Sequence, residues 1–343
     1  LTDFLNCGAQ WKLDRATINH FFVRYAMPLS WDFAEGNVLS EFPGGYDICL
    51  RKIAAGLDVV TQWRIGSPAP KVICASSVSR LTTDTYDVVL TDPPYYNAIG
   101  YAVVMDFFYV WLRRMLYGVS PEYQRVFSAP LTPKWDSNTQ DGELVDDASR
   151  HGDDSARSKL AYEQGMERVF GHCRQRLTEV GRLVVVFAHK DPDAWDALVS
   201  ATIRSGFVVD GSWPIRTEQA TRMRALSSAA LASSVWLACR PRQRGARPGW
   251  DNVVLEEMRR NIGSQLREFW DAGIHGPDFV WAATGPALEA YSKHPVVKKA
   301  NAPGETMSVG EFLKAVRRIV VEFVVGRVLG EAAHVDSEQG TAA

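Results

Sequence analysis

Apolar residues in this chain gather in short continuous runs that are separated by stretches of helical spacing. The clearest runs are Tyr86–Leu90 and Leu183–Ala188, and Lys71–Ala75 is another short run of the same kind. Continuous runs of this length are typical of strands that lie inside a parallel sheet and are buried on both faces. Phe207–Trp213 and Ser234–Arg240 predict two further strands. Together these runs predict one sheet.

Between the runs, apolar positions recur every three or four residues, which is the spacing of amphipathic helices. Residues 101–117 predict an apolar helix that ends before Gly118, and helices are also expected over 162–177 and 195–203. Alternating strands and helices predict a mostly parallel sheet with helices on both faces. The last two strands are joined by no clear helix, which suggests an antiparallel pair at one edge. Three more helices are expected towards the C-terminus, at about 253–271, 283–293 and 308–328, and Ser308 with Glu311 predicts a capping box at the start of the last one.

These patterns divide the chain into several parts. Residues 1–45 are rich in aromatic side chains and are expected to be irregular to helical. An α/β domain covers 46–241 and contains a polar, acidic insertion or flexible loop near 119–155. A helical extension occupies 250–330, and residues 331–343 form a tail that is expected to be disordered.

Composition narrows the class of protein. The formal net charge is only −2 over 343 residues, so any contact with nucleic acid must come from local patches. The five cysteines are scattered, which argues against a disulfide framework and a zinc site and fits a reducing cytoplasm. We expect neither a membrane span nor a signal peptide, because no apolar run approaches roughly 18 residues. The chain begins with Leu1 rather than Met, as expected for a fragment or an unusual start.

The motif Asp92-Pro93-Pro94-Tyr95 follows a predicted buried strand at its carboxyl end, where open α/β sheets bind ligands. The nitrogen of an aromatic amine is a poor nucleophile, because its lone pair is delocalised into the ring. The Asp92 carboxylate and the Pro93 carbonyl could hold both amine hydrogens, and Tyr95 offers a flat face for a base that has left its duplex. The motif therefore predicts a site that methylates the amino group of a base. The alternative is a loop that merely ends a strand.

The motif and its surroundings resemble the large prokaryotic adenine-specific DNA methylases of the zinc-ribbon type. The resemblance is most specific over Asp92–Ala102 and Asp106–Arg114 and extends over most of the chain, from about residue 5 to 325. It implies an α/β fold with a class I S-adenosylmethionine-dependent methyltransferase-like (Rossmann-like) sheet. It also implies S-adenosyl-L-methionine as the cofactor, DNA as the partner, and methyl transfer to the exocyclic amine of adenine in restriction–modification or phage defence.

Candidate site residues follow from the motif, from strand ends and from the resemblance. The candidate catalytic residues are Asp92, Pro93, Pro94 and Tyr95, and the candidate substrate-binding residues are Tyr96, Tyr101, His189 and Lys190. Ala75 and Ser76 resemble the position that contacts the adenine ring of the cofactor, and no metal is required. Asp106 could bond the Asp92 loop or serve a structural role. Arginines between Arg216 and Arg247 could grip phosphates, although exposed arginines on loops are usually only solvated.

Two expected features of the family are not found. A strand followed by a glycine-rich turn should hold the methionine end of the cofactor, but the nearest glycine cluster, Phe42–Tyr46, lacks a preceding apolar strand. No cysteine spacing supports a zinc ribbon. The sequence therefore predicts an incomplete sheet, with a cofactor site completed by an N-terminal half or a partner subunit. The alternatives are methylation of the cytosine amine, methylation of protein glutamine or RNA, and a non-catalytic DNA-binding or assembly module.

Overall fold

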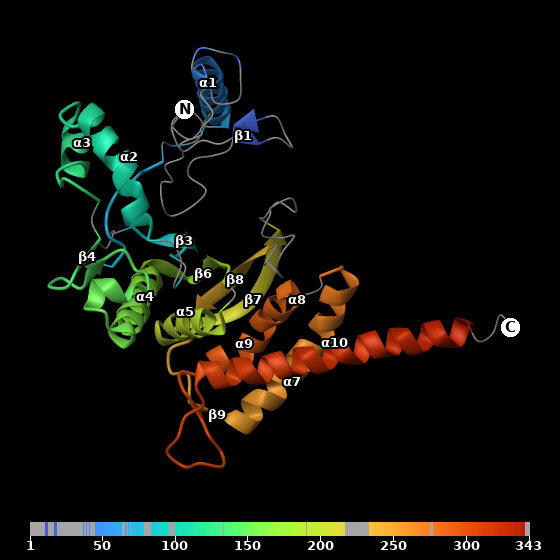
Figure 1. Cartoon of the computed structure of the whole chain (residues 1–343). Coiled ribbons are helices and arrows are strands. Elements are labelled where there is room, and N and C mark those ends of the chain that lie inside the picture. Colours follow the sequence, from blue (N-terminus) through green and yellow to red (C-terminus); the bar gives the residue numbers. More distant parts are fainter. Residues whose placement is uncertain are drawn as a thin grey trace. The chain divides into compact units, whose positions relative to one another are not determined.

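The computed structural model in Figure 1 forms two compact units, Leu1–Cys74 and Ala75–Ala343. The residues that the structure describes are 11–12, 17–18, 37, 39, 41, 45–63, 66, 68, 70–78, 84–94, 96, 100–132, 134–189, 191–216, 233–274 and 277–339. Each unit is described by itself below.

The first unit contains one long helix. Strands β1 (Trp11–Lys12) and β2 (Thr17–Ile18) form a short antiparallel pair, and α1 covers Tyr46–Trp63. None of the side chains of α1 is buried, although many are apolar. The expected strand at Lys71–Ala75 is not formed, and its residues are exposed without strand pairing. That prediction was wrong, because an apolar run becomes a strand only where a neighbouring strand accepts its hydrogen bonds.

The second unit is built on a four-stranded sheet with the order β3-β6-β8-β7. The strands are β3 (Tyr86–Thr91), β6 (Leu177–Phe187), β7 (Phe207–Arg216) and β8 (Ser233–Pro241). β3 and β6 run parallel, whereas β8 is antiparallel to both β6 and β7. The α/β class and the antiparallel pair at one edge are thus confirmed, but the expected mostly parallel sheet is wrong, because only β3 and β6 pair in parallel among the described strands.

β3 lies at the edge of this sheet, not in its middle as its apolar run predicted. Among the described strands it pairs only with β6. Val88 and Leu90 are 61% and 59% exposed, while Val89 packs against the core. A run suited to burial on both faces is therefore covered on one face only.

Most helices of the second unit share one hydrophobic core with the sheet. The bounds of the helices are α2 (Tyr101–Leu116), α3 (Pro121–Val126), α4 (Ser155–Arg176), α5 (Pro192–Arg204), α7 (Asp251–Asp271), α8 (Pro277–Ala282), α9 (Thr284–Ser292) and α10 (Val309–Gln339). Of these, α2 and α3 contribute no residue to the shared core. α4 packs on α5, and α9 packs on β7 so closely that the N–H of Gly285 donates to the hydroxyl of Ser212 (3.0 Å). β9 (Gly249–Trp250) and β10 (Val297–Lys298) form a short parallel pair beside α7. In the described part of the chain, no helix has both the length and the apolar character of a membrane span.

The acidic stretch near 119–155 is folded, which differs from the expected flexible loop. It contains α3, a small hairpin of β4 (Trp135–Asp136) and β5 (Asp141–Gly142), and the 3-10 helix η1 (Ala148–His151). Leu144 and Val145 are buried. The stretch folds because its acidic groups have specific partners, which belong to the candidate site.

The two ends of α10 show what local signals can and cannot predict. The predicted capping box is present, since Ser308 and Glu311 exchange bonds between side chain and backbone N–H (3.1 and 2.8 Å). The helix continues to Gln339, however, so the expected disordered tail is helical over 331–339. Alanine and glutamate in this segment favour helix despite its polar composition.

Candidate functional site

The segment Asp92–Pro94 directly follows β3 at the carboxyl end of the sheet. Because β3 and β6 are parallel, with Thr91 beside Val185, both strands end at the same edge. β6 ends at Phe187, and His189 follows in the next loop. The structure therefore brings two of the predicted segments to the edge where open α/β sheets place their ligands.

The three described residues of the motif, Asp92, Pro93 and Pro94, have different surroundings. The side chain of Asp92 is exposed, whereas Pro93 is buried. The carbonyl of Pro94 accepts a hydrogen bond from the hydroxyl of Tyr162 on α4 (3.0 Å). Within the described residues, nothing bonds the Asp92 carboxylate or the Pro93 carbonyl. The loop is thus anchored through its second proline, and neither predicted acceptor is bonded by a described residue.

Tyr96 supports this loop from the core. It is 5% exposed, and its ring meets that of Tyr162 edge-on (centroids 5.2 Å apart). Its backbone carbonyl accepts from the N–H of Asp146 (2.8 Å). Burial, reinforced by the Asp146 carboxylate, raises the pKa of the Tyr96 phenol, so the hydroxyl stays protonated. The sequence predicted that Tyr96 binds the substrate. In the structure its ring is almost fully buried, so neither face is open for a base to stack on.

His189 is held in one orientation beside the motif. Its Nδ1 accepts from the N–H of Asp191 (3.0 Å), and its carbonyl accepts from the indole N–H of Trp195 (2.9 Å). The ring stacks on Phe187 and meets Tyr96 edge-on (6.1 and 6.4 Å between centroids). Because Nδ1 accepts, the neutral ring carries its proton on Nε2.

Protonation of His189 should make the protein less stable in mild acid. Burial lowers the pKa of this imidazole below its ordinary value of about 6.5, although Asp191 opposes the shift. Above about pH 6.5 the ring is neutral in both states, and its contribution to stability is complete. Below that pH the unfolded chain binds a proton that the folded chain takes up only at lower pH, so the free energy of unfolding falls.

The measurement is urea unfolding at a series of pH values for the wild type and for His189→Gln, which cannot titrate. We expect the wild type to lose stability relative to the variant as the pH falls through this window. Parallel pH profiles for the two proteins would contradict the assignment.

The N-terminus of α2 is fixed by the acidic stretch. Glu143 accepts from the backbone N–H of Ala102 (3.1 Å) and pairs with Arg150 (2.8 Å). The two side chains of this pair are only 12% and 9% exposed. Tyr101, a predicted substrate contact, begins the helix and is exposed. Its phenol is therefore open to a ligand at the end of the motif loop.

Asp106 has a structural role. Its carboxylate accepts from Lys134 (2.7 Å) and from both the backbone N–H and the hydroxyl of Thr132. Although partial burial acts in the opposite direction, these bonds hold the pKa of Asp106 below its ordinary value. Of the two alternatives raised by the sequence, the structure supports a carboxylate that ties α2 to the acidic stretch.

The predicted cofactor residues are not at a strand end. The hydroxyl of Ser76 donates to the carboxylate of Asp141 on β5 (2.6 Å), and Ala75 is exposed in a bend. This corrects the prediction, because the strand that was to place Ala75 and Ser76 at the edge of the sheet is absent. Tyr95 and Lys190 lie outside the described residues.

The functional residues that the sequence did not reveal are Tyr162, Glu143, Asp146 and Arg150. Tyr162 fitted the helical spacing of a core residue, but nothing local marks its bond to Pro94, 68 positions away. The other three lie in the stretch that was taken for an insertion. In the described part of the chain, no group of three or more His, Cys, Asp or Glu residues could hold a metal ion. Comparison of the chain with models of protein families, curated proteins and solved structures found no match.

Proposed function

We propose that this chain carries the amine-binding part of a DNA methyltransferase, which transfers a methyl group from S-adenosyl-L-methionine to the exocyclic amine of adenine. One observation carries the proposal. The Asp92 carboxylate and the Pro93 carbonyl stand side by side in the chain, unbonded by any described residue, at the carboxyl end of β3. Tyr162 occupies the next carbonyl, that of Pro94, and leaves these two acceptors to a ligand.

The chemistry of this arrangement suits an amino group on a flat ring. A carboxylate and a carbonyl that each accept one N–H draw the nitrogen out of conjugation with the ring, which makes its lone pair available. The Pro93 carbonyl belongs to backbone that is anchored at the next residue, so this acceptor needs little reorganisation when the amine arrives. The exposed ring of Tyr101, at the start of α2, and His189, in the loop after β6, flank the motif and would orient the base. Asp rather than Ser at the first position of the motif favours adenine over cytosine.

The described residues do not form a complete site for the cofactor. No glycine-rich turn joins a strand to a helix in the described ranges, and the hydroxyl of Ser76 is already bonded to Asp141. S-adenosyl-L-methionine supplies an activated methyl group when bound, but no step through it follows from these residues. We therefore place the rest of the cofactor site on a separate segment, an N-terminal half or a partner subunit.

The exposed edge of the sheet supports a cofactor site that is shared between this chain and a separate segment. β3 has a strand on one side only among the described residues, and Val88 and Leu90 expose an apolar surface beside that edge. A free edge of this kind accepts another strand through its unpaired backbone groups. A strand added there parallel to β3 would also bring its own carboxyl end next to Asp92, which is where a cofactor turn is needed.

The test begins with calorimetric titration of the purified chain with S-adenosyl-L-methionine, followed by an assay of methyl transfer to adenine-containing DNA. The same proteins are titrated with oligonucleotides that contain either adenine or purine, which lacks the amino group. We expect Asp92→Ala to lower methyl transfer by about a hundredfold or more, the usual effect of removing one charge-stabilising group. Asp92→Asn keeps an acceptor oxygen and should retain part of the activity. Asp271→Ala, an exposed change of the same charge on α7, serves as the control.

Three outcomes separate the alternatives. Methyl transfer by the chain that requires Asp92 supports the proposal directly. A folded chain that does not bind the cofactor, yet prefers adenine to purine through Asp92, supports an amine-binding part that needs its companion. A folded chain with neither transfer nor an Asp92-dependent preference contradicts the proposal and leaves a module without this chemistry.

A further inference from the structure

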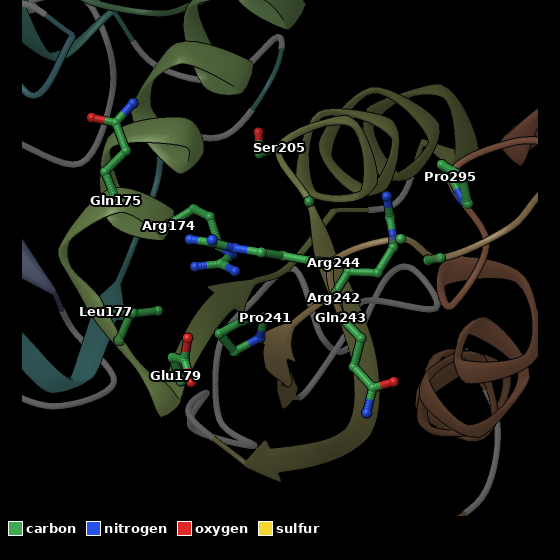
Figure 2. A pocket seen from close by; sticks show the side chains of 13 residues that line it. Arg174, Gln175, Leu177, Glu179, Ser205, Pro241, Arg242, Gln243, Arg244 and Pro295 are labelled. Atoms are coloured by element: carbon green, nitrogen blue, oxygen red, sulfur yellow. The ribbon is translucent and has the colours of Figure 1, made fainter.

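A pocket of about 910 Å³ lies at the opposite end of the sheet from Asp92. It is formed where α4 passes into β6, where α5 ends at Ser205, and where β8 leaves the sheet at Pro241. Figure 2 shows the side chains of Arg174, Arg242 and Arg244 around it. Glu179 is the single acidic residue of the lining. The volume is in the range of pockets that take small molecules.

The three arginines are not equivalent. Arg242 has a structural role, since its guanidinium donates to the carbonyls of Ser292 (2.8 Å), Ile203 (2.7 Å) and Phe207 (3.0 Å). Arg174 and Arg244 have neither a carboxylate nor a carbonyl partner within the described residues. Figure 2 shows both side chains reaching towards the same part of the pocket, one from α4 and one from the loop after β8.

The loop that carries Arg244 is fixed at both ends. The N–H of Arg242 donates to the carbonyl of Gly206 (2.8 Å), and the N–H of Gly249 donates to the carbonyl of Val296 (2.9 Å). Gly245 turns the chain with a φ of +80°, a conformation that glycine adopts readily. The backbone that carries Arg244 is thus held beside the pocket, and its exposed side chain lines the pocket.

Two guanidinium groups that approach one cavity repel each other unless an anion lies between them. Their planar forks match the geometry of phosphate oxygens, which accept paired N–H bonds. We propose that Arg174 and Arg244 bind the phosphate group of a small phosphorylated ligand in this pocket.

The pocket is separate from the site of the proposed methyl transfer. It opens at Leu177, the first residue of β6, whereas the motif loop lies beside the last residues of that strand. A strand of 11 residues spans about 30 Å or slightly more, so one small ligand cannot touch both places. The proposal therefore does not rest on the proposed function, and DNA seated at Asp92 does not explain the pocket.

The experiment is calorimetric titration of the full chain with pyrophosphate, at low and at physiological ionic strength. The double variant Arg174→Ala/Arg244→Ala is compared with Arg259→Ala/Arg260→Ala, which removes the same charge from exposed positions on α7. We expect the pocket variant to bind pyrophosphate about tenfold or more weakly, since each lost fork removes charge-assisted bonds. The control variant should bind as the wild type does. Replacing both pocket arginines by lysine keeps the charge but loses the fork, and should give an intermediate affinity.

Duplex DNA is titrated with the same set of proteins. Pyrophosphate binding that depends on Arg174 and Arg244 supports the proposal. Equal losses in the pocket and control variants would overturn it, because they would reflect net charge alone. Absence of pyrophosphate binding by the folded wild type would overturn it as well. DNA binding that needs the two arginines, without binding of pyrophosphate, would assign them to a nucleic-acid backbone and reject the small ligand.

Discussion

Replacing Arg150 by methionine is expected to lower the free energy of unfolding by about 3–5 kcal/mol, because it leaves the charge of Glu143 buried without its partner. The two side chains are 9% and 12% exposed and approach to 2.8 Å. Glu143 also accepts from the backbone N–H of Ala102, so its unpaired charge would disturb the first turn of α2. The measurement is urea unfolding followed by circular dichroism, with the variant and the wild type at the same pH.

A matched control is provided by the pair of Arg204 and Glu167, which has the same separation of 2.8 Å but is 47% and 40% exposed. Arg204→Met should cost at most about 1 kcal/mol, because water screens an exposed pair. The double variant Glu143→Gln/Arg150→Met should be more stable than the sum of its single changes predicts, since it leaves no buried charge. Equal costs for Arg150→Met and Arg204→Met would contradict the structural role of the buried pair.

The sequence predicted the elements whose signal is local. The run Leu183–Ala188 corresponds to the second half of β6, which ends at Phe187. The predicted helix around Trp195 and Leu198 is α5, and both of these side chains are fully buried. Caps were visible for the same reason, because Ser308 and Glu311 are three positions apart. Burial was not predicted for the acidic stretch. Glu143 pairs with the nearby Arg150, but it also accepts from the backbone N–H of Ala102, 41 positions away, and only the fold brings these two groups together.

The candidate site divides in the same way. Asp92 and His189 could be predicted to lie at the same edge of the sheet, because both follow strands that end there. The anchor from Tyr162 to Pro94 joins a helix and a loop 68 positions apart, and no spacing rule predicts it. The strand expected at Lys71–Ala75 failed for a related reason. Whether an apolar run pairs depends on a neighbour, and no described strand is in place to pair with it.

Trp195 connects the core to the candidate site, and replacing it is the second change for which we expect a large loss in the free energy of unfolding. Its side chain is fully buried, stacks on Trp281 (4.4 Å between centroids) and meets Phe187 edge-on (5.0 Å). Its indole N–H donates to the carbonyl of His189 (2.9 Å). We expect Trp195→Ala to lower the free energy of unfolding by about 3–5 kcal/mol, the usual cost of emptying a large aromatic site.

Trp195→Phe separates the packing from the hydrogen bond. Phenylalanine fills much of the cavity but cannot donate to the His189 carbonyl, so a cost of about 1–3 kcal/mol is expected from the unpaired group and the residual void. The exposed Trp111 on α2 provides the control, and Trp111→Ala should change stability by about 0.5 kcal/mol or less. Circular dichroism is the appropriate signal, because tryptophan fluorescence changes with the substitutions themselves. If Trp195→Phe is as stable as the wild type while Trp195→Ala is not, the indole contributes volume alone, and the orientation of His189 must depend on Asp191.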